Sequence, residues 1–442
     1  MVKCNLYFAI LVYIIQNIWR FPILPPKKLL KNVLFFDTNP FGRTCVLRKC
    51  QIETDMSIVL TDLSVVCALG STLDAILQNG MASYLGGMKS VSFSSCKTVF
   101  GYVTDELPDE ALRCNALLSK AADGIDIDSL KRRYSSDRIG IVLGGCNTGI
   151  NEALANIRDL QKSEWEYSAS GFELEQISLG TAVTFLKKKM RCNGPAFVVS
   201  TACSSSAKAF QSARNLILSG ACDCVIVGGV DAFSEFTIRG FNSLEVLSDL
   251  QTIPMSKNRK GINLGEGAAL FVMEKDSDRT NLKGNVIELK GIGESSDAHH
   301  ITSPDPSGAG AVISMKKALA DAKLNAGDIS YINLHGTGSV YNDSMEAKAV
   351  YQIFGDRTPC ASTKPMTGHT LGASGAIELG LSYLMLKHNV IFPHVYDGEF
   401  DSSLKPINLA TVSCKSEVKN ILSNSFAFGG SNVSVIIGKR NS

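Results

Sequence analysis

Cys203 is the residue of this sequence whose setting best suits nucleophilic chemistry. The apolar run Ala196–Val199 before it is typical of a short buried strand. Apolar residues then recur at helical spacing from Ala207 to Ile217, and Gly220 is a natural helix stop. The free backbone N–H groups and the dipole at a helix start favour a thiolate, the nucleophilic form of cysteine. The position suits covalent catalysis, although an inert buried thiol fits the same pattern.

Two histidines occur in matching surroundings. His335 follows the apolar run Tyr331–Leu334 and precedes Gly-Thr-Gly-Ser, and His369 stands between Lys364 and a glycine-containing turn. Loops between rigid elements hold such residues firmly, and a neutral imidazole can donate a hydrogen bond to a developing oxyanion. A single histidine of this kind is usually structural. Two of them, together with a cysteine at a helix start, indicate a catalytic set.

Three further positions could support this set. Asp343 and Glu346 have the spacing of a helix capping box, with Asp343 as the cap. A functional interpretation instead pairs Glu346 with Lys364, which would keep the lysine charged, and the two interpretations are compatible. Phe428 precedes two glycines, and such a turn can present N–H groups as half of an oxyanion hole or be an ordinary glycine turn.

The elements that must position these residues follow an α/β pattern, because apolar runs alternate with helical stretches from Met56 onward. We expect strands at Ser57–Thr61, Arg138–Leu143, Cys224–Val227, Ala268–Met273, Asn285–Leu289, Tyr331–Leu334 and Val433–Ile437. We expect helices at Leu73–Gln78, Ala311–Ala322 and Ser374–Leu386. The last of these is apolar nearly all round and therefore buried. The glycine pairs after Leu143 and Val227 should end their strands and let backbones approach closely.

The first 55 residues lie outside this pattern. Residues 6–19 are apolar apart from Gln16 and Asn17, which is short for a membrane span of about 20 residues. The alternatives are a membrane anchor, a targeting segment, and translated sequence ahead of a start at Met56. The globular pattern that begins at Ser57 favours the last, so membrane contact is expected only if residues 6–19 are an anchor.

Composition narrows the class of protein. Hydrophobic residues make up 45% and charged residues 19% of the 442, as in a globular enzyme. A formal net charge of +2 argues against nucleic acid as a partner. The 13 cysteines are odd in number and irregularly spaced, so we expect reduced thiols in a cytoplasmic protein. No histidine cluster has metal-ligand spacing, and no metal site is expected.

The combined motifs resemble those of β-ketoacyl-acyl-carrier-protein synthases: Thr201-Ala-Cys203-Ser-Ser, His335-Gly-Thr, Lys364 with Gly368-His369, and Phe428-Gly-Gly. The resemblance extends in order and spacing from about Ser57 to Gly438. It implies a thiolase-like α/β fold, with two similar halves at residues 56–284 and 285–442 that form a five-layered α-β-α-β-α core. The pair of histidines resembles the chain-elongating type, whereas the initiating type has Cys-His-Asn.

The resemblance implies a decarboxylative Claisen condensation that needs no metal or organic cofactor. Cys203 would carry an acyl group delivered by an acyl carrier protein, and its N–H and that of Phe428 would form the oxyanion hole. His335 and His369 would promote carbon dioxide loss from malonyl carrier protein, whose carbanion lengthens the chain by two carbons. Lys364, near Glu346, resembles the lysine that organises the site electrostatically.

Four further residues are assigned to substrate by the same resemblance. Thr337 and Ser339 match the hydroxyl positions that bind the phosphopantetheine arm of the carrier, Phe241 resembles an acyl-pocket residue, and Thr302 a substrate-binding one. Phe428 also resembles a gating phenylalanine. Glu245 stands where many relatives have an arginine that docks the carrier, so carrier choice is expected to differ.

A closer resemblance concerns the ketosynthases of bacterial aryl-polyene clusters, and it rests on Arg113–Leu118, Gly261–Gly267 and Gly293–Pro304. Fatty-acyl and aryl-polyene chains, and a homodimer and a ketosynthase heterodimer, stay open as alternatives. A non-catalytic chain-length partner typically lacks the nucleophile, and a cysteine hydrolase needs an orienting carboxylate or amide for its base. The presence of Cys203 with both histidines favours an active synthase.

Overall fold

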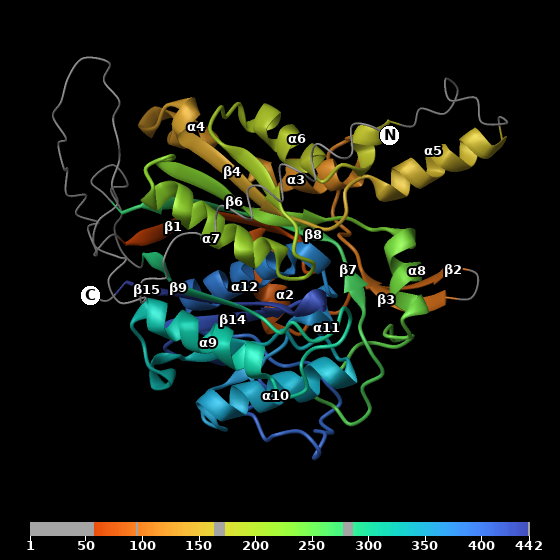
Figure 1. Cartoon of the computed structure of the whole chain (residues 1–442), viewed down its shortest axis with the longest axis vertical. Coiled ribbons are helices and arrows are strands. Elements are labelled where there is room, and N and C mark those ends of the chain that lie inside the picture. Colours follow the sequence, from red (N-terminus) through yellow and green to blue (C-terminus); the bar gives the residue numbers. More distant parts are fainter. Residues whose placement is uncertain (1–56, 94–95, 163–172, 277–285, 441–442) are drawn as a thin grey trace, which may run out of the picture. The chain divides into compact units, whose positions relative to one another are not determined.

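The computed structural model describes residues 57–93, 96–162, 173–276 and 286–440. Within them, one ten-stranded mixed sheet runs in the order β11-β10-β14-β15-β9-β1-β8-β6-β4-β5 (Figure 1). One set of five strands consists of β1 (Ile58–Val66), β4 (Ile139–Gly144), β5 (Ala196–Val199), β6 (Cys224–Asp231) and β8 (Gly267–Lys275). The other consists of β9 (Ile287–Ser296), β10 (Tyr331–Asn333), β11 (Cys360–Ala361), β14 (Asn420–Phe426) and β15 (Ser431–Lys439). The sets meet where β1 pairs antiparallel with β9, Val59 opposite Glu288.

Helices lie in three layers around the two sets of strands (Figure 1). Helices α3 (Arg113–Asp123) and α6 (Gly180–Met190) cover the outer face of the first set. Helices α7 (Ser205–Leu218) and α12 (Ser374–His388) fill the space between the sets. Helices α9 (Ala309–Ala322) and α10 (Val340–Phe354) cover the outer face of the second set. This α-β-α-β-α arrangement confirms the predicted fold class.

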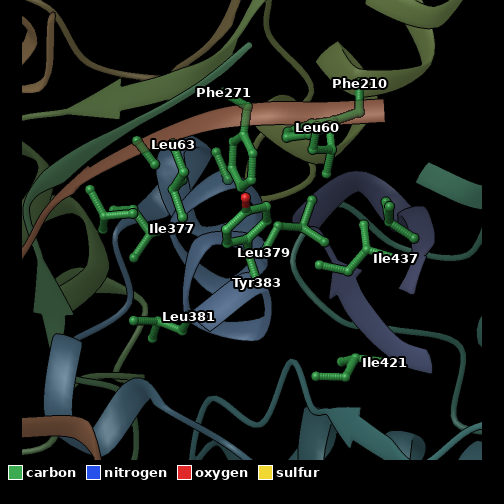
Figure 2. Packing of buried hydrophobic residues seen from close by; sticks show 14 of the residues in the cluster. Leu60, Leu63, Phe210, Phe271, Ile377, Leu379, Leu381, Tyr383, Ile421 and Ile437 are labelled. Atoms are coloured by element: carbon green, nitrogen blue, oxygen red, sulfur yellow. The ribbon is translucent and has the colours of Figure 1, made fainter. Parts of the chain in front are cut away.

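The central layer is the largest apolar core, and Figure 2 shows part of it. The ring of Phe271 on β8 meets the edge of Phe210 on α7, with centroids 5.1 Å apart, and that of Tyr383 on α12, 6.2 Å apart. Helix α12 is buried from Ser374 to Leu386, as its all-round apolar sequence predicted. Burial of this area is the main source of stability, at roughly 25 cal/mol per Å² of apolar surface.

The remaining elements are shorter or peripheral. They are α2 (Leu73–Met81), β2 (Met88–Phe93), β3 (Cys96–Gly101), α4 (Ile127–Arg133), α5 (Ile150–Lys162), α8 (Glu235–Ser243), β7 (Leu264–Gly265), α11 (Lys364–Thr367), β12 (Val390–Ile391) and β13 (Cys414–Lys415). Strands β2, β3 and β7 form a separate small sheet, beside which α8 lies in Figure 1.

Two local predictions were wrong. The second glycine pair does not end its strand, because Gly228 and Gly229 pair with β8 inside β6. Asp343 does not cap a helix, because α10 begins at Val340 with Ser339 as its N-cap.

The predicted division after residue 284 and the alternatives for residues 1–55 lie outside the described residues. In the described part of the chain, no helix is long and apolar enough to cross a membrane, and all ten cysteines are free thiols.

Candidate active site

A tight elbow between β5 and α7 presents Cys203. Ala202, directly before the cysteine, has a φ of 54°, in the left-handed region that an L-residue enters only at a cost of about 1–2 kcal/mol. Strand β4 approaches the helix start closely: a Cβ on Gly144 would lie 2.1 Å from the backbone nitrogen of Ser206. This strained, glycine-dependent turn holds the cysteine at the helix start that the sequence predicted, as strained backbone often does at functional sites.

His369 contacts the nucleophile directly. Its Nε2 lies 3.0 Å from Cys203 Sγ, and its Nδ1 lies 2.9 Å from the hydroxyl oxygen of Ser374, the first residue of α12. The His369 backbone N–H donates to the carbonyl of Asn263 at 2.7 Å. Leu371, two residues later, also has a left-handed φ of 50°. The imidazole is therefore held on both sides, and its Ser374 partner can either donate or accept a hydrogen bond.

His335 leaves the end of β10 and stands perpendicular to His369, with ring centroids 5.2 Å apart and planes at 86°. Its Nδ1 lies 3.4 Å from Lys364 Nζ. An ammonium group only donates, so Nδ1 must accept and the ring proton must sit on Nε2. The lysine thereby makes His335 a fixed hydrogen-bond donor.

The predicted pairing of Lys364 with Glu346 was wrong. The Lys364 ammonium instead forms an ion pair with Glu378, and both side chains are almost fully buried, at 1% and 2% exposed. Glu378 was not predicted as a site residue, because the helix that carries it is apolar nearly all round. The signal was present, since a lone carboxylate inside a buried apolar helix must be paired.

Glu346 supports the site through the backbone. Its two carboxylate oxygens accept the N–H groups of His335, at 2.8 Å, and of Gly336, at 2.7 Å. Asn424 donates to the same carboxylate at 3.4 Å. Glu346 thus fixes the turn that carries His335, a positioning role that neither sequence interpretation contained.

The turn at Phe428 contributes to the environment of the thiol. Gly429 and Gly430 have φ values of 79° and 75°, which glycine adopts without strain. The backbone N–H groups of Phe428 and of Cys203 itself both lie where they lower the pKa of the Cys203 thiol. Two N–H groups that converge on one sulfur can also converge on the oxygen of a thioester bound to it.

Burial outweighs these favourable groups in the resting enzyme. It raises the pKa of Cys203 to about 12, against the opposing charge of Lys364 and the N–H of Phe428. The thiolate expected from the helix start is therefore not the resting form. Burial, and then the Lys364 charge, hold the pKa of both His335 and His369 well below 6.5, so both rings are neutral near pH 7. The resting site contains a thiol and two neutral imidazoles.

One cavity of about 610 Å³, open to solvent, brings most of the predicted residues together. Cys203, His335, His369 and Phe428 line it, and so do all four predicted substrate residues, Phe241, Thr302, Thr337 and Ser339. Lys364 and Glu346 lie behind the histidines and do not line it.

The cavity walls have an apolar and a polar side. The rings of Phe241 and Phe428 stack, with centroids 5.7 Å apart and planes at 17°. The hydroxyl oxygens of Thr337 and Ser339 lie 3.1 Å apart. Such a cavity suits an apolar chain that ends in a polar, flexible arm.

Asp231 is a buried group that sequence reasoning missed. It ends β6, and its carboxylate accepts the N–H groups of Cys146, Asn147 and Ala373. Burial raises its pKa to about 7. Asp231 ties the loop after β4 to the segment that follows His369, and an acidic residue at a buried strand end was the signal available.

Replacing Lys364 by methionine should destabilise the protein by about 3–5 kcal/mol, because it leaves the buried Glu378 carboxylate without its partner. The double variant Lys364→Met with Glu378→Leu should regain most of that loss. Chemical denaturation of the wild type, the single variant and the double variant measures the free energy of unfolding of each. A double variant no more stable than Lys364→Met would contradict the prediction.

Glu346 should make stability depend on pH. Burial raises its pKa from 4.5 to about 7, so between these values the unfolded chain releases a proton that the folded state keeps. The contribution of Glu346 to the free energy of unfolding is therefore fully present below pH 4.5. It is lost as pH rises to 7, by up to about 1.4 kcal/mol per pH unit. The free energy of unfolding, measured at pH 5 and at pH 7, should fall less between these two values in Glu346→Gln than in the wild type. An equal fall in both proteins would contradict this prediction.

Among the described residues, no group of three or more His, Cys, Asp or Glu side chains is placed to hold a metal ion.

Comparison with known proteins shows which family the chain matches. The family model of the β-ketoacyl synthase N-terminal domain matches residues 115–279, and that of the C-terminal domain matches residues 286–396.

Individual relatives agree with these models. A 3-oxoacyl-[acyl-carrier-protein] synthase 2 of Rhizobium meliloti (strain 1021) is 35% identical over 312 residues, 68% of this chain and 72% of the relative. Nodulation protein E of the same strain is 28% identical over 400 residues, 86% of this chain and 98% of the relative. A solved structure, the ketosynthase ApeO in complex with its chain length factor ApeC from Xenorhabdus doucetiae, matches with a TM-score of 0.82 and 36% identity, covering 88% of this chain and 99% of that one. As the motifs predicted, the chain belongs to the β-ketoacyl synthase family.

Proposed function

We propose that the protein is an active β-ketoacyl-acyl-carrier-protein synthase in which Cys203 carries the growing acyl chain. The observation that carries the proposal is the 3.0 Å contact between Cys203 Sγ and His369 Nε2, with His335 beside them in the same cavity. A non-catalytic chain-length partner does not need a histidine in contact with a cysteine thiol, because it transfers no acyl group.

In the first step, Cys203 Sγ attacks the carbonyl of an acyl thioester as its proton moves to His369 Nε2. The N–H groups of Cys203 and Phe428 stabilise the oxyanion, and the leaving pantetheine thiolate then takes the proton from His369. The high thiol pKa supports proton transfer during attack rather than a stored thiolate. Acyl transfer leaves the enzyme neutral and acylated.

In the second step, malonyl carrier protein loses carbon dioxide. His335 and His369 donate hydrogen bonds from Nε2 to the thioester oxygen, which carries the enolate charge. The carbanion attacks the acyl-Cys203 carbonyl, the sulfur leaves, and one proton from solvent restores the thiol. Ser374 supports both roles of His369, because a hydroxyl can accept from Nδ1–H in the first step and donate to Nδ1 in the second.

The substrates are carrier-bound, and no other cofactor is required. Thr337 and Ser339 bind the phosphopantetheine arm, and Phe241 and Thr302 contact substrate. Glu245 is exposed, so the docking face differs in charge from that of relatives with arginine there. We place the protein in the cytoplasm, as expected for an enzyme that uses soluble carriers.

An aryl-polyene-type acyl chain and a ketosynthase heterodimer are the more specific proposals. They rest on the subgroup motifs and on the 36% identity to the structure of a ketosynthase with its chain length factor. Two of those motifs are coupled, because Arg113 Nε donates to the buried Glu266 at 2.6 Å. A homodimer is the alternative. To distinguish the two, the protein is purified alone and together with a ketosynthase-like subunit encoded by a neighbouring gene, and the mass of each assembly is measured.

The test of the main proposal is a reconstituted condensation. The protein is incubated with an acyl carrier protein charged with an acyl group and with malonyl carrier protein, and the products are weighed by mass spectrometry. We expect a β-ketoacyl product two carbons longer and one equivalent of carbon dioxide. Free acid release without chain extension would instead support a hydrolase.

A further inference from the structure

A third histidine is buried as deeply as the two that the proposed reaction uses. His394 follows β12 and is 2% exposed, as are His335 and His369. Its ring does not line the cavity, but both ring nitrogens have backbone partners. The Nδ1 atom lies 3.1 Å from the nitrogen of Ser362, and Nε2 lies 2.9 Å from the carbonyl oxygen of Pro254. The ring therefore connects two segments that are far apart in the sequence.

The protonation of the His394 ring follows from these partners. The Ser362 N–H can only donate, so Nδ1 accepts and the ring proton sits on Nε2, where it donates to the Pro254 carbonyl. Burial lowers the pKa of His394 to about 4, so the ring is neutral near pH 7. Each nitrogen thus makes a different kind of hydrogen bond to a different segment.

The contact with Ser362 leads to the residues proposed for decarboxylation. The Ser362 hydroxyl donates to the carbonyl of Gly336 at 2.6 Å and accepts the N–H of Lys364 at 3.2 Å. Gly336 directly follows His335, and Lys364 fixes the ring proton of that histidine. The packing is close, since a Cβ on Gly336 would lie 2.6 Å from the Cβ of Ser362. A displaced Ser362 would therefore shift His335 and Lys364 together.

The contact with Pro254 leads to the turn proposed to bind the pantetheine arm. The peptide between Pro254 and Met255 is held on both sides, because its carbonyl accepts from the ring and its N–H donates to Asp343 at 2.9 Å. Met255 has a left-handed φ of 65°, which an L-residue keeps only where its surroundings restrain it. The other carboxylate oxygen of Asp343 accepts the N–H of Gly338, in the middle of the turn Thr337–Ser339, at 3.2 Å.

The two paths meet again in the loop that carries Thr337. Hydrogen bonds run from the Gly336 carbonyl, through the His394 ring, to the Gly338 N–H two residues further along the chain. Gly336 and Gly338 have φ values of 35° and 82°, which glycine enters freely and leaves as freely. The closed ring of hydrogen bonds supplies the restraint that these two glycines lack.

We propose that His394 is a positioning residue for the condensation reaction. Through Ser362 it holds His335 in the geometry for decarboxylation. Through Pro254 it holds the turn Thr337–Ser339 in the geometry for binding the arm. The inference rests on the proposed function and adds to it a residue that acts from outside the cavity. Because the two contacts are separate, their loss affects kcat in the first case and KM in the second.

Two variants of similar shape separate the contacts. His394→Asn places an amide oxygen close to the position of Nδ1, so it keeps the contact with Ser362 and loses that with Pro254. His394→Gln places an amide nitrogen close to the position of Nε2, so it keeps the contact with Pro254 and loses that with Ser362. Release of labelled carbon dioxide at a series of malonyl carrier protein concentrations gives kcat and KM for each protein.

The two variants should show opposite effects. In His394→Asn, we expect KM for malonyl carrier protein to rise about tenfold, with kcat within about threefold of the wild type. In His394→Gln, we expect kcat to fall about tenfold, with KM within about threefold of the wild type. His394→Leu keeps neither contact and should show both losses.

Tyr396→Leu is the matched control. The Tyr396 ring packs against that of His394, with centroids 5.2 Å apart, but takes part in neither of its two hydrogen bonds. This variant should keep the wild-type kcat and KM even if it lowers the unfolding temperature. A merely structural His394 would give another pattern: kcat would fall in step with the unfolding temperature in all the variants, and KM would not change.

The outcomes separate the two proposals. If His394→Asn and His394→Gln change kcat and KM in the same proportion, or if both keep the wild-type values, the positioning role is refuted and the synthase stands. If the folded wild type releases no carbon dioxide from malonyl carrier protein, the proposed function is refuted and the positioning role with it.

Discussion

Replacing Cys203 by alanine is expected to abolish condensation, with a fall of at least about a thousandfold in product formation. Without the sulfur there is no covalent acyl intermediate, and the carbanion formed from malonyl carrier protein has no electrophile within the site. The fold should persist, because the cysteine is small and its elbow is held by Ala202 and by the close approach of Gly144 to α7.

Cys146→Ala is the control for this experiment. Its thiol is partly buried, with its sulfur 3.8 Å from the hydroxyl oxygen of Ser205, and burial raises its pKa. Incubation with an acyl thioester should add one acyl mass to the wild type and to Cys146→Ala, and none to Cys203→Ala. An acyl adduct of unchanged stoichiometry on Cys203→Ala would show that another residue is the nucleophile.

Replacing His335 or His369 by alanine should lower malonyl decarboxylation by about a hundredfold to a thousandfold each. The two rings share one developing charge, so the double variant should lose far less than the product of the single losses. Release of labelled carbon dioxide from malonyl carrier protein measures this step alone. The exposed His388 provides the control, since His388→Ala removes an imidazole at the end of α12.

The two histidines should also differ in acyl transfer. His369 contacts the thiol at 3.0 Å and accepts its proton, whereas His335 is held as a donor by Lys364. Loss of His369 should therefore slow acylation of Cys203, and loss of His335 should leave that half-reaction nearly intact. Equal effects of both variants on acylation would contradict the assignment of the proton to His369.

A pH profile tests the neutral state of the rings. Both pKa values lie well below 6.5, with the Lys364 charge as one cause, so decarboxylation should not fall between pH 8 and pH 6.5. In Lys364→Met that charge is absent, the pKa values rise, and the acid limb of the profile should move to higher pH. An unmoved limb would show that the lysine does not set the protonation of the histidines.

Local sequence determined the elements of this protein. Periodicity identified the strands and helices that hold the site, because the backbone geometry of each element repeats every two or 3.6 residues whatever its neighbours do. Residue types at the ends of those elements identified Cys203, His335 and His369, and the combined motifs indicated the family. Glycine pairs were ambiguous, since the same residues end one strand and continue through another, as Gly228 and Gly229 do inside β6.

Tertiary structure decided how the site works. Ser374 and Glu378 stand one turn apart on α12, and only packing of that helix against the sheet brings one to His369 and the other to Lys364. A functional interpretation of the sequence had paired Glu346 with Lys364, but no local signal reports a contact made by folding. The protonation of Cys203 shows the same limit: the helix start favours a thiolate, whereas burial, which depends on the whole fold, makes the resting group a thiol.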